Sequence, residues 1–424
     1  MQLTKYPPRN IWKDLIRRPA INNDRLSETV SGILDAVRQK GDEAVRTYEA
    51  KFDHVELENL LLTDAEKEEA NRLVSDELKQ AILIAKANIE TFHSAQKQDL
   101  PKIETSPGVV CWQKALPVEK VGLYIPCGTA PLFSTVLMLA VPAKIAGCRE
   151  IILCSPPNRD GQIHPAVIFA AEAAGVDKIF KIGGVQAIGA MAYGTESVPQ
   201  VYKIFGPGNQ YVTAAKQIVG LKEVAIDLPA GPSEVEVIAD ETACPAFVAS
   251  DLLSQAEHGA DSQSILLTTS EELAEAVLPE IEALLNTLPR KELAEKSLSH
   301  SRIIVLRTCE EIIEMTNAYA PEHLIIETLN YQEIADQIIN AGSIFLGHYA
   351  PESAGDYASG TNHTLPTNGY ARMYSGVNLD SFMKKITFQE ITKEGIRNLG
   401  PTIQVLAENE QLVAHRNAVR VRMK

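Results

Sequence analysis

The sequence predicts an α/β protein with two doubly wound, Rossmann-like parallel-sheet domains, a helical N-terminal arm and a helical C-terminal tail. From Val118 onward, short and almost continuously apolar runs alternate with helical segments. Strands that are apolar along their whole length are typical of parallel sheets covered by helices on both faces. The alternation runs twice, on either side of a glycine- and proline-bearing segment at 230–234, as an internal duplication would produce.

The expected elements follow this alternation in order. In the first unit, the strands are expected at 121–125, 151–154, 177–182, 202–205 and 224–227. The helices between them are expected at 134–146, 165–174, 185–193 and 209–219. In the second unit, the strands are expected at 235–239, 264–267, 303–306, 323–326 and 343–346. Its helices are expected at 246–257, from about 271, at 310–319 and at 331–340.

The two ends of the chain are predicted to lie outside the sheets. Residues 1–22 form an arm that is too short for a core of its own and is interrupted by prolines. Apolar residues recur at helical spacing over 26–52 and 64–96, and we interpret these helices as scaffold. From about residue 378 the chain is again helical and ends in the basic segment 414–424. That tail either docks on another subunit or is a solvated terminus.

Composition narrows the class of protein. The 424 residues carry a formal net charge of −15 and are 45% hydrophobic, which fits a globular protein and disfavours nucleic acid or an anionic membrane as the main partner. The six cysteines are scattered without a C-x-x-C pair, so we expect neither a disulfide framework nor a cysteine zinc site. No apolar stretch is long enough to span a bilayer, and the first residues do not resemble a secretory signal. We therefore expect a protein of the reducing cytoplasm.

Three glycine-bearing turns follow expected strands, at 126–131, 183–184 and 205–209. Glycine lets backbone amides approach a phosphate, and ligands of doubly wound folds sit beyond the carboxyl ends of the strands. None of the turns is the G-x-G-x-x-G fingerprint, and each one alone is more often a tight packing turn. Three of them at one edge of a sheet favour a nucleotide site.

The stretch 350–366 gathers Glu352, Asp356, Asn362 and His363 among two glycines and two prolines. Because proline and glycine interrupt regular structure, we expect neither a regular helix nor a central strand here. Loops held on a rigid scaffold often carry binding and catalytic groups. The alternative is a solvated surface loop.

Two further groups of residues could carry chemistry. The helix at 246–257 places Asp251, Gln255 and His258 on one face, and oxygen and imidazole ligands at this spacing suit a divalent metal such as zinc. A histidine near a helix end is equally explained by its favourable interaction with the helix dipole. Glu322 and His323 stand at the start of an expected strand, where they could divide acid–base work. An ordinary surface pair is the alternative.

Six longer segments stand out in chain order: G-L-Y-I-P-C-G-T-A-P-L-F-S-T-V-L-M (122–138), I-F-G-P-G-N (204–209), D-L-P-A-G-P-S-E-V (227–235), D-L-L-S-Q-A-E-H-G (251–259), Y-A-P-E-H-L (319–324) and S-A-G-D-Y-A-S-G-T-N-H-T-L-P-T (353–367). Together they resemble the L-histidinol dehydrogenase family. The resemblance covers almost the whole chain.

The resemblance implies roles for particular residues. It implies one zinc ion per subunit, with the ligands Gln255, His258, Asp356 and His415, of which the last comes from the partner subunit. It implies Glu322 and His323 as the catalytic acid–base pair. The substrate contacts that it implies are Ser233, Gln255, His258, Glu322, His323, Asp356, His363, Glu410 and His415. The NAD contacts that it implies are Tyr124, Gln186 and Asn209. Asp251 matches no ligand of the family.

The resemblance also implies an activity and an organisation. The family oxidises L-histidinol to L-histidine with two NAD and one water, through bound L-histidinaldehyde, in a homodimer whose active sites are shared between subunits. The implied domains are a discontinuous one of residues 23–128 and 234–376, a second of 129–233, and a tail of 377–424 docked on the partner.

One residue departs from the family, and two other functions stay open. Cys127 stands where the family usually has glycine, and we interpret it as a tolerated small residue. A zinc-dependent hydrolase would need the metal and Glu322 with His323, but not the glycine-bearing turns. A nucleotide-binding regulatory module would need the turns but not the metal ligands.

Overall fold

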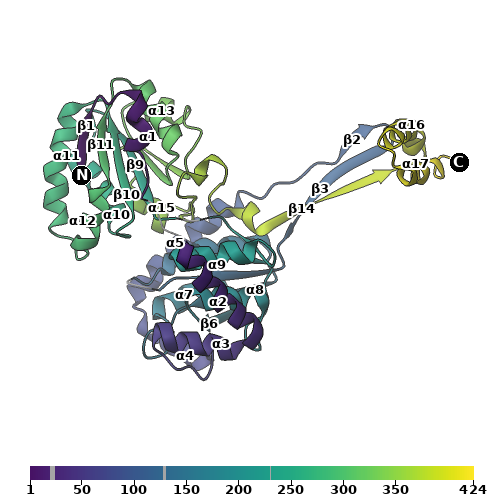
Figure 1. The fold of residues 1–424 in the computed structure, drawn as a ribbon, viewed down its shortest axis with the longest axis horizontal. Helices are drawn as coiled ribbons and strands as arrows, with labels where there is room; N and C mark the ends of the chain where they lie inside the picture. The colour runs from purple at the N-terminus through teal and green to yellow at the C-terminus, as the bar shows by residue number, and fades with distance from the viewer. Residues whose placement is uncertain (20–23, 128–129, 230) are drawn as a thin grey trace.

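The computed structural model describes residues 1–19, 24–127, 130–229 and 231–424. Two α/β lobes lie side by side, and a narrow arm projects from them and ends at the C-terminus (Figure 1). The part of the glycine-bearing turn at 128–129 lies outside the described residues. Within the described ranges, no helix combines the length and the apolar character needed to cross a membrane.

One lobe is built on an entirely parallel five-stranded sheet with the strand order β6-β5-β4-β7-β8. The strands are β4 (Lys120–Tyr124), β5 (Glu150–Ser155), β6 (Lys178–Lys181), β7 (Lys203–Phe205) and β8 (Ala225–Ile226). The helices between them are α6 (Phe133–Ala146), α7 (Pro165–Ala174), α8 (Gly184–Tyr193) and α9 (Gln210–Gly220). The expected first unit is confirmed in its order of elements.

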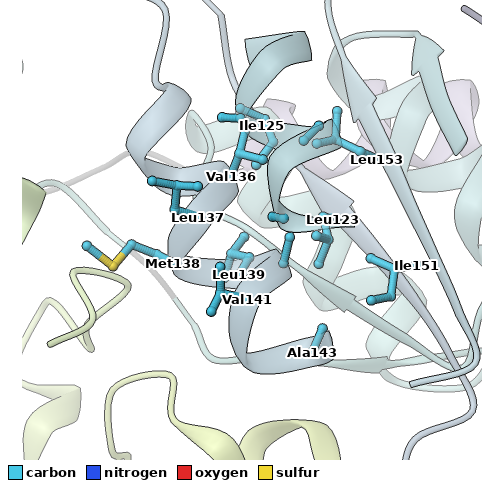
Figure 2. Packing of buried hydrophobic residues seen from close by; sticks show 14 of the residues in the cluster. Leu123, Ile125, Val136, Leu137, Met138, Leu139, Val141, Ala143, Ile151 and Leu153 are labelled. Carbon is cyan, nitrogen blue, oxygen red and sulfur yellow. The ribbon is translucent and has the colours of Figure 1, made fainter. Parts of the chain in front are cut away.

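Side chains of the central strands alternate between the two faces of this sheet. Leu123 and Leu153 point to one face and pack with α6 and α7, as Figure 2 shows for α6. Tyr124 and Ile152 point to the opposite face and pack with α8 and α9. A strand that is buried on both faces has to be apolar at every position, which explains the continuous apolar runs of the sequence.

Four N-terminal helices complete the cover of this same sheet. They are α2 (Asp24–Lys40), α3 (Asp42–Tyr48), α4 (Asp64–Leu73) and α5 (Asp76–Ser94). Val30 and Val37 of α2 share a core with Ile188 of α8, and Ile89 of α5 lies in the core around α6. The expected grouping of residues 23–128 with 234–376 therefore differs from the packing, because amphipathic helices do not specify in their sequence which sheet they cover.

The single helix expected over 64–96 is wrong. Val74 has extended backbone angles and ends α4, and Ser75 starts α5 by accepting a hydrogen bond from the backbone N–H of Leu78 at 3.2 Å. A serine N-cap of this kind stabilises a helix start by about 1 kcal/mol. The break lets α4 pack on α7 while α5 packs on α6.

The second lobe is built on a parallel six-stranded sheet with the strand order β1-β11-β10-β9-β12-β13. The strands are β1 (Gln2–Lys5), β9 (Glu234–Ala239), β10 (Gln263–Thr268), β11 (Arg302–Val305), β12 (His323–Glu327) and β13 (Ser343–Leu346). One face is covered by α10 (Pro245–Ala256), α11 (Glu271–Leu285) and α12 (Lys291–Ser299). The other face is covered by α1 (Trp12–Leu15), α13 (Cys309–Tyr319) and α14 (Tyr331–Ala335).

The N-terminal arm is part of this sheet. The expected helical arm begins instead with strand β1, which pairs in parallel with β11 at one edge, and only then turns into the short helix α1. The four residues of β1 are too few to show an alternation of apolar residues, so no strand pattern is visible there in the sequence.

The projecting arm is an antiparallel three-stranded sheet, in the order β14-β3-β2, capped by two helices (Figure 1). The elements are β2 (Ile103–Ser106), β3 (Val109–Pro117), β14 (Met383–Ile391), α16 (Lys393–Asn409) and α17 (Val413–Arg420). The predicted helical tail is confirmed in α16 and α17, but strand β14 precedes them, where helix was expected from about residue 378. Nearly every residue of β14 is exposed, so the strand has no buried face that would leave a pattern in the sequence.

The buried carboxyl group of Glu236 provides a test of this fold. Glu236 is fully buried in β9, one of the two middle strands of its sheet, and burial raises the pKa of its carboxyl group to about 8. An unfolded chain ionises this group near its ordinary pKa of 4.5, so the unfolded state binds fewer protons than the native state between those two pH values. Stability contributed at low pH is therefore lost as the pH rises through that window.

Glu236→Gln is expected to raise the melting temperature by several degrees at pH 9 and to change it little at pH 5, because glutamine has the same shape and carries no charge. One pKa unit corresponds to about 1.4 kcal/mol. Thermal unfolding at the two pH values measures the effect. An equal change at both would mean that ionisation of Glu236 does not limit stability.

Candidate active site

The first part of the site lies at the carboxyl end of α10. Gln255 occupies the last turn of this helix and is fully buried, and His258 follows just after the helix end. The partial negative charge of a helix carboxyl end favours a cation nearby. The buried Oε1 of Gln255 has no hydrogen-bond partner among the described residues, so this oxygen is free to bind a cation.

The second part of the site is a short helix, α15 (Glu352–Tyr357), within the stretch 350–366. The expectation that this stretch contains no regular helix is wrong for these six residues. The helix places Glu352 and Asp356 on one face, because residues four apart are neighbours on a helix. One ligand atom each of His258, Glu352 and Asp356 lies within 4.8 Å of the others. This cluster has the size and donor atoms of a divalent metal site.

His323 lies directly against this cluster, at the first residue of β12. Its Nδ1 is 3.1 Å from the carbonyl oxygen of Glu234 and 3.2 Å from the Nε2 of Gln255. Its Nε2 is 3.4 Å from Oδ1 of Asp356. The neighbouring carboxyl group of Glu322 accepts a hydrogen bond of 2.9 Å from the backbone N–H of Glu234. The expected acid–base pair and the metal-competent side chains therefore lie together, with Glu322, His323, Gln255 and Glu352 buried and His258 exposed.

Carboxyl groups surround His323 in this site and shift the pKa values of one another and of the imidazole. Burial by itself would lower the pKa of His323, but the carboxylates of Glu352, Glu322 and Asp356 outweigh it and raise that pKa well above its ordinary value. Burial raises the pKa of Glu322 to about 8, and burial and the other carboxylates raise that of Glu352 to about 8. Several carboxyl groups thus compete for protons in a small buried volume. A bound cation would relieve this competition.

The stretch 350–366 also joins the site to the other lobe. His363 contacts the carbonyl oxygen of Asp356 through Nδ1 at 2.9 Å and the hydroxyl of Thr135 through Nε2 at 3.1 Å. The side-chain amide of Asn362 donates to the carbonyl of Met138 at 2.6 Å. Thr135 and Met138 belong to α6, which follows the carboxyl end of β4. The metal-competent cluster of one lobe therefore faces the carboxyl edge of the sheet in the other.

The three residues expected to contact NAD lie at this carboxyl edge. Tyr124 ends β4 and its hydroxyl accepts from the N–H of Gly184 at 3.1 Å. Gln186 lies in the first turn of α8, and the side chain of Asn209 caps α9. At Gly206, which has a φ of +127°, an added Cβ would lie 2.0 Å from the carbonyl oxygen of Tyr124. Only glycine therefore allows this turn to approach β4 so closely.

Tyr124 and Gln186 are almost completely buried. A third side chain, Glu49, joins this region, because its Oε1 accepts from the side-chain amide of Gln186 at 2.8 Å and from the N–H of Gly183 at 2.9 Å. Nothing in the sequence singled out Glu49. It lies in a short π-helical segment, Glu49–Asp53, and such segments are frequent at functional sites.

Three of the expected site residues lie apart from the cluster or only near it. Ser233 lies immediately before β9, beside the glycine- and proline-bearing turn. Glu410 and His415 are exposed residues at the end of the projecting arm, which Figure 1 shows far from α10 and α15. Within one chain, the structure therefore brings together Gln255, His258, Asp356, Glu322, His323 and His363, but not Glu410 or His415.

Comparison with known proteins identifies the family. A family model for histidinol dehydrogenase matches residues 16–423. The chain belongs to the histidinol dehydrogenase family. It is 64% identical to the histidinol dehydrogenase of Bacteroides fragilis over 424 residues, which cover 100% of this chain and 99% of that one. It is 54% identical to that of Escherichia coli K12 over 414 residues, or 97% and 94% of the two chains.

A solved structure agrees with this membership. The crystal structure of histidinol dehydrogenase from Elizabethkingia anophelis has a TM-score of 0.98 and 55% sequence identity, and the match covers 100% of this chain and 98% of that one. An acetylating aldehyde dehydrogenase from Geobacillus thermoglucosidasius, at 17% identity and a TM-score of 0.50, shares the fold. The α/β architecture and the enzyme class predicted from the sequence are therefore confirmed.

In this histidinol dehydrogenase family member, sequence reasoning missed Glu352 as part of the cluster. It named Glu352 as a carboxylate of the stretch 350–366 but gave it no role there. Its spacing of four residues from Asp356 indicates a shared helix face only if a helix continues across Gly355. The buried position of Glu352, with an Oε2 that has no partner among the described residues, comes from the structure alone.

Proposed function

We propose that this chain catalyses the four-electron oxidation of L-histidinol to L-histidine, the last step of histidine biosynthesis, through bound L-histidinaldehyde and with two NAD and one water. The observation that supports this most directly is the cluster in which His258, Glu352 and Asp356 adjoin Glu322 and His323. Its position opposite the glycine-bearing turns of the other lobe supports a substrate held within reach of a nucleotide. The six cysteines are free thiols, which fits a reducing cytoplasm.

The residues present suit zinc. Gln255 Oε1 and Asp356 Oδ1 are buried oxygens that find no hydrogen-bond partner in the described part of the chain, and His258 offers an imidazole nitrogen beside them. We assign Gln255, His258 and Asp356 as the ligands from one chain and His415 of the partner subunit as the fourth. When bound, one zinc per subunit would act as a Lewis acid that grips substrate nitrogen atoms, since zinc itself has no redox chemistry.

Glu322 and His323 divide the proton transfers of the reaction between them. His323 takes the proton of the substrate alcohol as general base while hydride leaves for NAD, and it serves again in the second oxidation. Glu322 removes a proton from the water that attacks the aldehyde carbon. Each acid–base role contributes roughly two to four orders of magnitude in rate. Ser233 and His363 hold the substrate, and the buried side chains of Glu322, His323 and Glu352 around it keep the reactive aldehyde away from solvent.

NAD would lie against the carboxyl edge of the five-stranded sheet. We assign its contacts to Tyr124, Gln186 and Asn209, whose turns lie at that edge. This is the edge that faces the metal-competent cluster through His363 and Thr135. When bound there, NAD would supply the acceptor for the hydride of each oxidation, and these residues would set its position and orientation.

We further propose a homodimer with shared active sites. Glu410 and His415 are exposed at the end of the arm, remote from the rest of their own site. Val405, Leu406 and Val413 on the same arm are each more than half exposed, and an apolar surface of this kind is typical of a subunit interface. The arm of one chain would therefore complete the site of its partner.

The decisive experiment measures NADH formation from L-histidinol, before and after treatment with a chelator, and again after zinc is added back. NADH should form, disappear on chelation and return with zinc. Absence of NAD reduction under every metal condition would overturn the proposal. Metal-dependent hydrolysis without NAD would point to a hydrolase instead.

Replacing Glu322 with glutamine separates the two oxidations. Glutamine keeps the size and the hydrogen bond from Glu234 N–H, but it cannot accept a proton from water. Oxidation of supplied L-histidinaldehyde is therefore expected to fall by roughly two orders of magnitude or more, and oxidation of L-histidinol to the aldehyde by much less. The two rates are measured separately as NADH formation. Equal losses would exclude Glu322 as the residue that activates water.

A further inference from the structure

The backbone of Glu234 contacts both members of the acid–base pair. Its N–H donates to Oε2 of Glu322 at 2.9 Å, and its carbonyl oxygen is 3.1 Å from Nδ1 of His323. These contacts arise because β9 and β12 are neighbouring parallel strands, with His323 opposite Val235. The orientation of Glu322 and His323 therefore depends on where the first residue of β9 lies.

The side chain of Glu234 is held by Arg18, a residue of the N-terminal arm. Nε of Arg18 donates to Oε1 at 2.5 Å, and Nη2 donates to Oε2 at 2.7 Å. The backbone N–H of Asn368 also donates to Oε1, at 2.6 Å. A bidentate guanidinium–carboxylate pair fixes both distance and plane, which a single charged contact does not.

The same guanidinium reaches the chain that leads into Glu322. Nη2 of Arg18 also donates to the carbonyl oxygens of Tyr319 at 2.9 Å and Ala320 at 3.3 Å, and the group lies 4.0 Å over the ring of Tyr319. Ala320 has a φ of +55°, which is an unfavourable conformation for a residue with a side chain. Arg18 thus links the first residue of β9 to the segment just before β12.

We infer that Arg18 is a positioning residue for the Glu322–His323 pair and acts through Glu234. Among the described residues its hydrogen bonds go to Glu234, Tyr319 and Ala320, none of which is an assigned zinc ligand or holds the substrate, so its loss should leave metal and substrate binding largely in place. The geometry of proton transfer should suffer instead, because a displacement of about 1 Å in a catalytic group can cost about 100-fold in rate. This inference rests on the proposed function, since kcat is its readout.

The test replaces Arg18 with methionine and with lysine, and uses Arg9→Met as the matched control. Arg9 belongs to the same arm, but it pairs with Glu314 at the surface and stacks on Trp12. For each variant, zinc content, melting temperature, kcat and KM for L-histidinol are measured well below the melting temperature. Arg18→Met is expected to lower kcat about 10- to 100-fold with KM and zinc content nearly unchanged.

The variants also separate positioning from stability. Arg18→Lys retains the positive charge but cannot form the bidentate pair with Glu234. Its kcat is therefore expected to lie between those of Arg18→Met and the parent chain. If Arg18→Met does not fold, Arg18→Lys and Glu234→Gln provide the same comparison. An unchanged kcat in a folded Arg18 variant would overturn the inference while leaving the proposed function intact. A parent chain that forms no NADH would instead overturn the proposed function.

Discussion

Replacing His323 with asparagine is expected to lower NADH formation from L-histidinol by roughly two to four orders of magnitude. Asparagine can still donate to the carbonyl of Glu234, as Nδ1 of the imidazole does, but it has no basic nitrogen to accept the alcohol proton. Both oxidations should be lost together, because the same base serves in each. Steady-state NADH formation gives the rate, and metal analysis and binding of L-histidinol report whether the site is still assembled.

The metal analysis is necessary because His323 lies close to Gln255 and Asp356. A suitable control is His164→Asn, since His164 is an exposed helix cap whose Nδ1 accepts from Ala166 N–H, and asparagine is also a good cap. That control should retain full activity. Turnover near the parent rate in the His323 variant, with zinc bound, would remove His323 from the role of base.

Two inactive variants are expected to restore activity when their chains are combined. His258→Asn and His415→Asn should each lose zinc and turnover, because each removes one assigned ligand from every site of its own homodimer. In a mixed dimer with shared sites, one site has both defects and the other has none. Random reassociation makes half of the dimers mixed, so the recovered activity should reach about a quarter of the parent value.

The structure supplies a control for this mixing experiment. His258 and Asp356 lie in one cluster within a single chain, so mixing His258→Asn with Asp356→Asn leaves a defect in both sites of every dimer. That mixture should stay inactive. If the mixture of His258→Asn and His415→Asn also stayed inactive, while size analysis showed mixed dimers, the assignment of His415 to the partner subunit's site would be wrong.

The parts of the fold that the sequence predicted are those in which burial leaves a pattern. The strands β4, β5, β9, β10, β11 and β12 are buried on both faces and were expected within one or two residues of their bounds. Strands β1 and β14 were missed for different reasons. Strand β1 is a short edge strand, and β14 is long but has hardly any buried residue. The break between α4 and α5 depends on Ser75, one polar residue in a continuous helical pattern.

In the site, too, local spacing predicted the residues that are near in the chain, and tertiary packing decided the rest. Helical spacing brought Gln255 and His258 together, and adjacency in the chain brought Glu322 and His323 together. These two pairs come together only through the parallel pairing of β9 with β12 and the return of α15 to the end of α10. Arg18 and Glu234 are too far apart in the chain for any spacing rule to connect them. Such contacts are decided by packing, and a single sequence does not contain them.

The projecting arm of β2, β3 and β14 determines the order in which this molecule can be assembled. Strand β14 pairs with β3, although well over half of the chain lies between them. During synthesis, β3 must therefore wait without its partner strand while both lobes emerge and fold, and pairs with so large a sequence separation form slowly. If the arm completes the site of a second chain, refolding chains should regain turnover late, and faster at higher protein concentration.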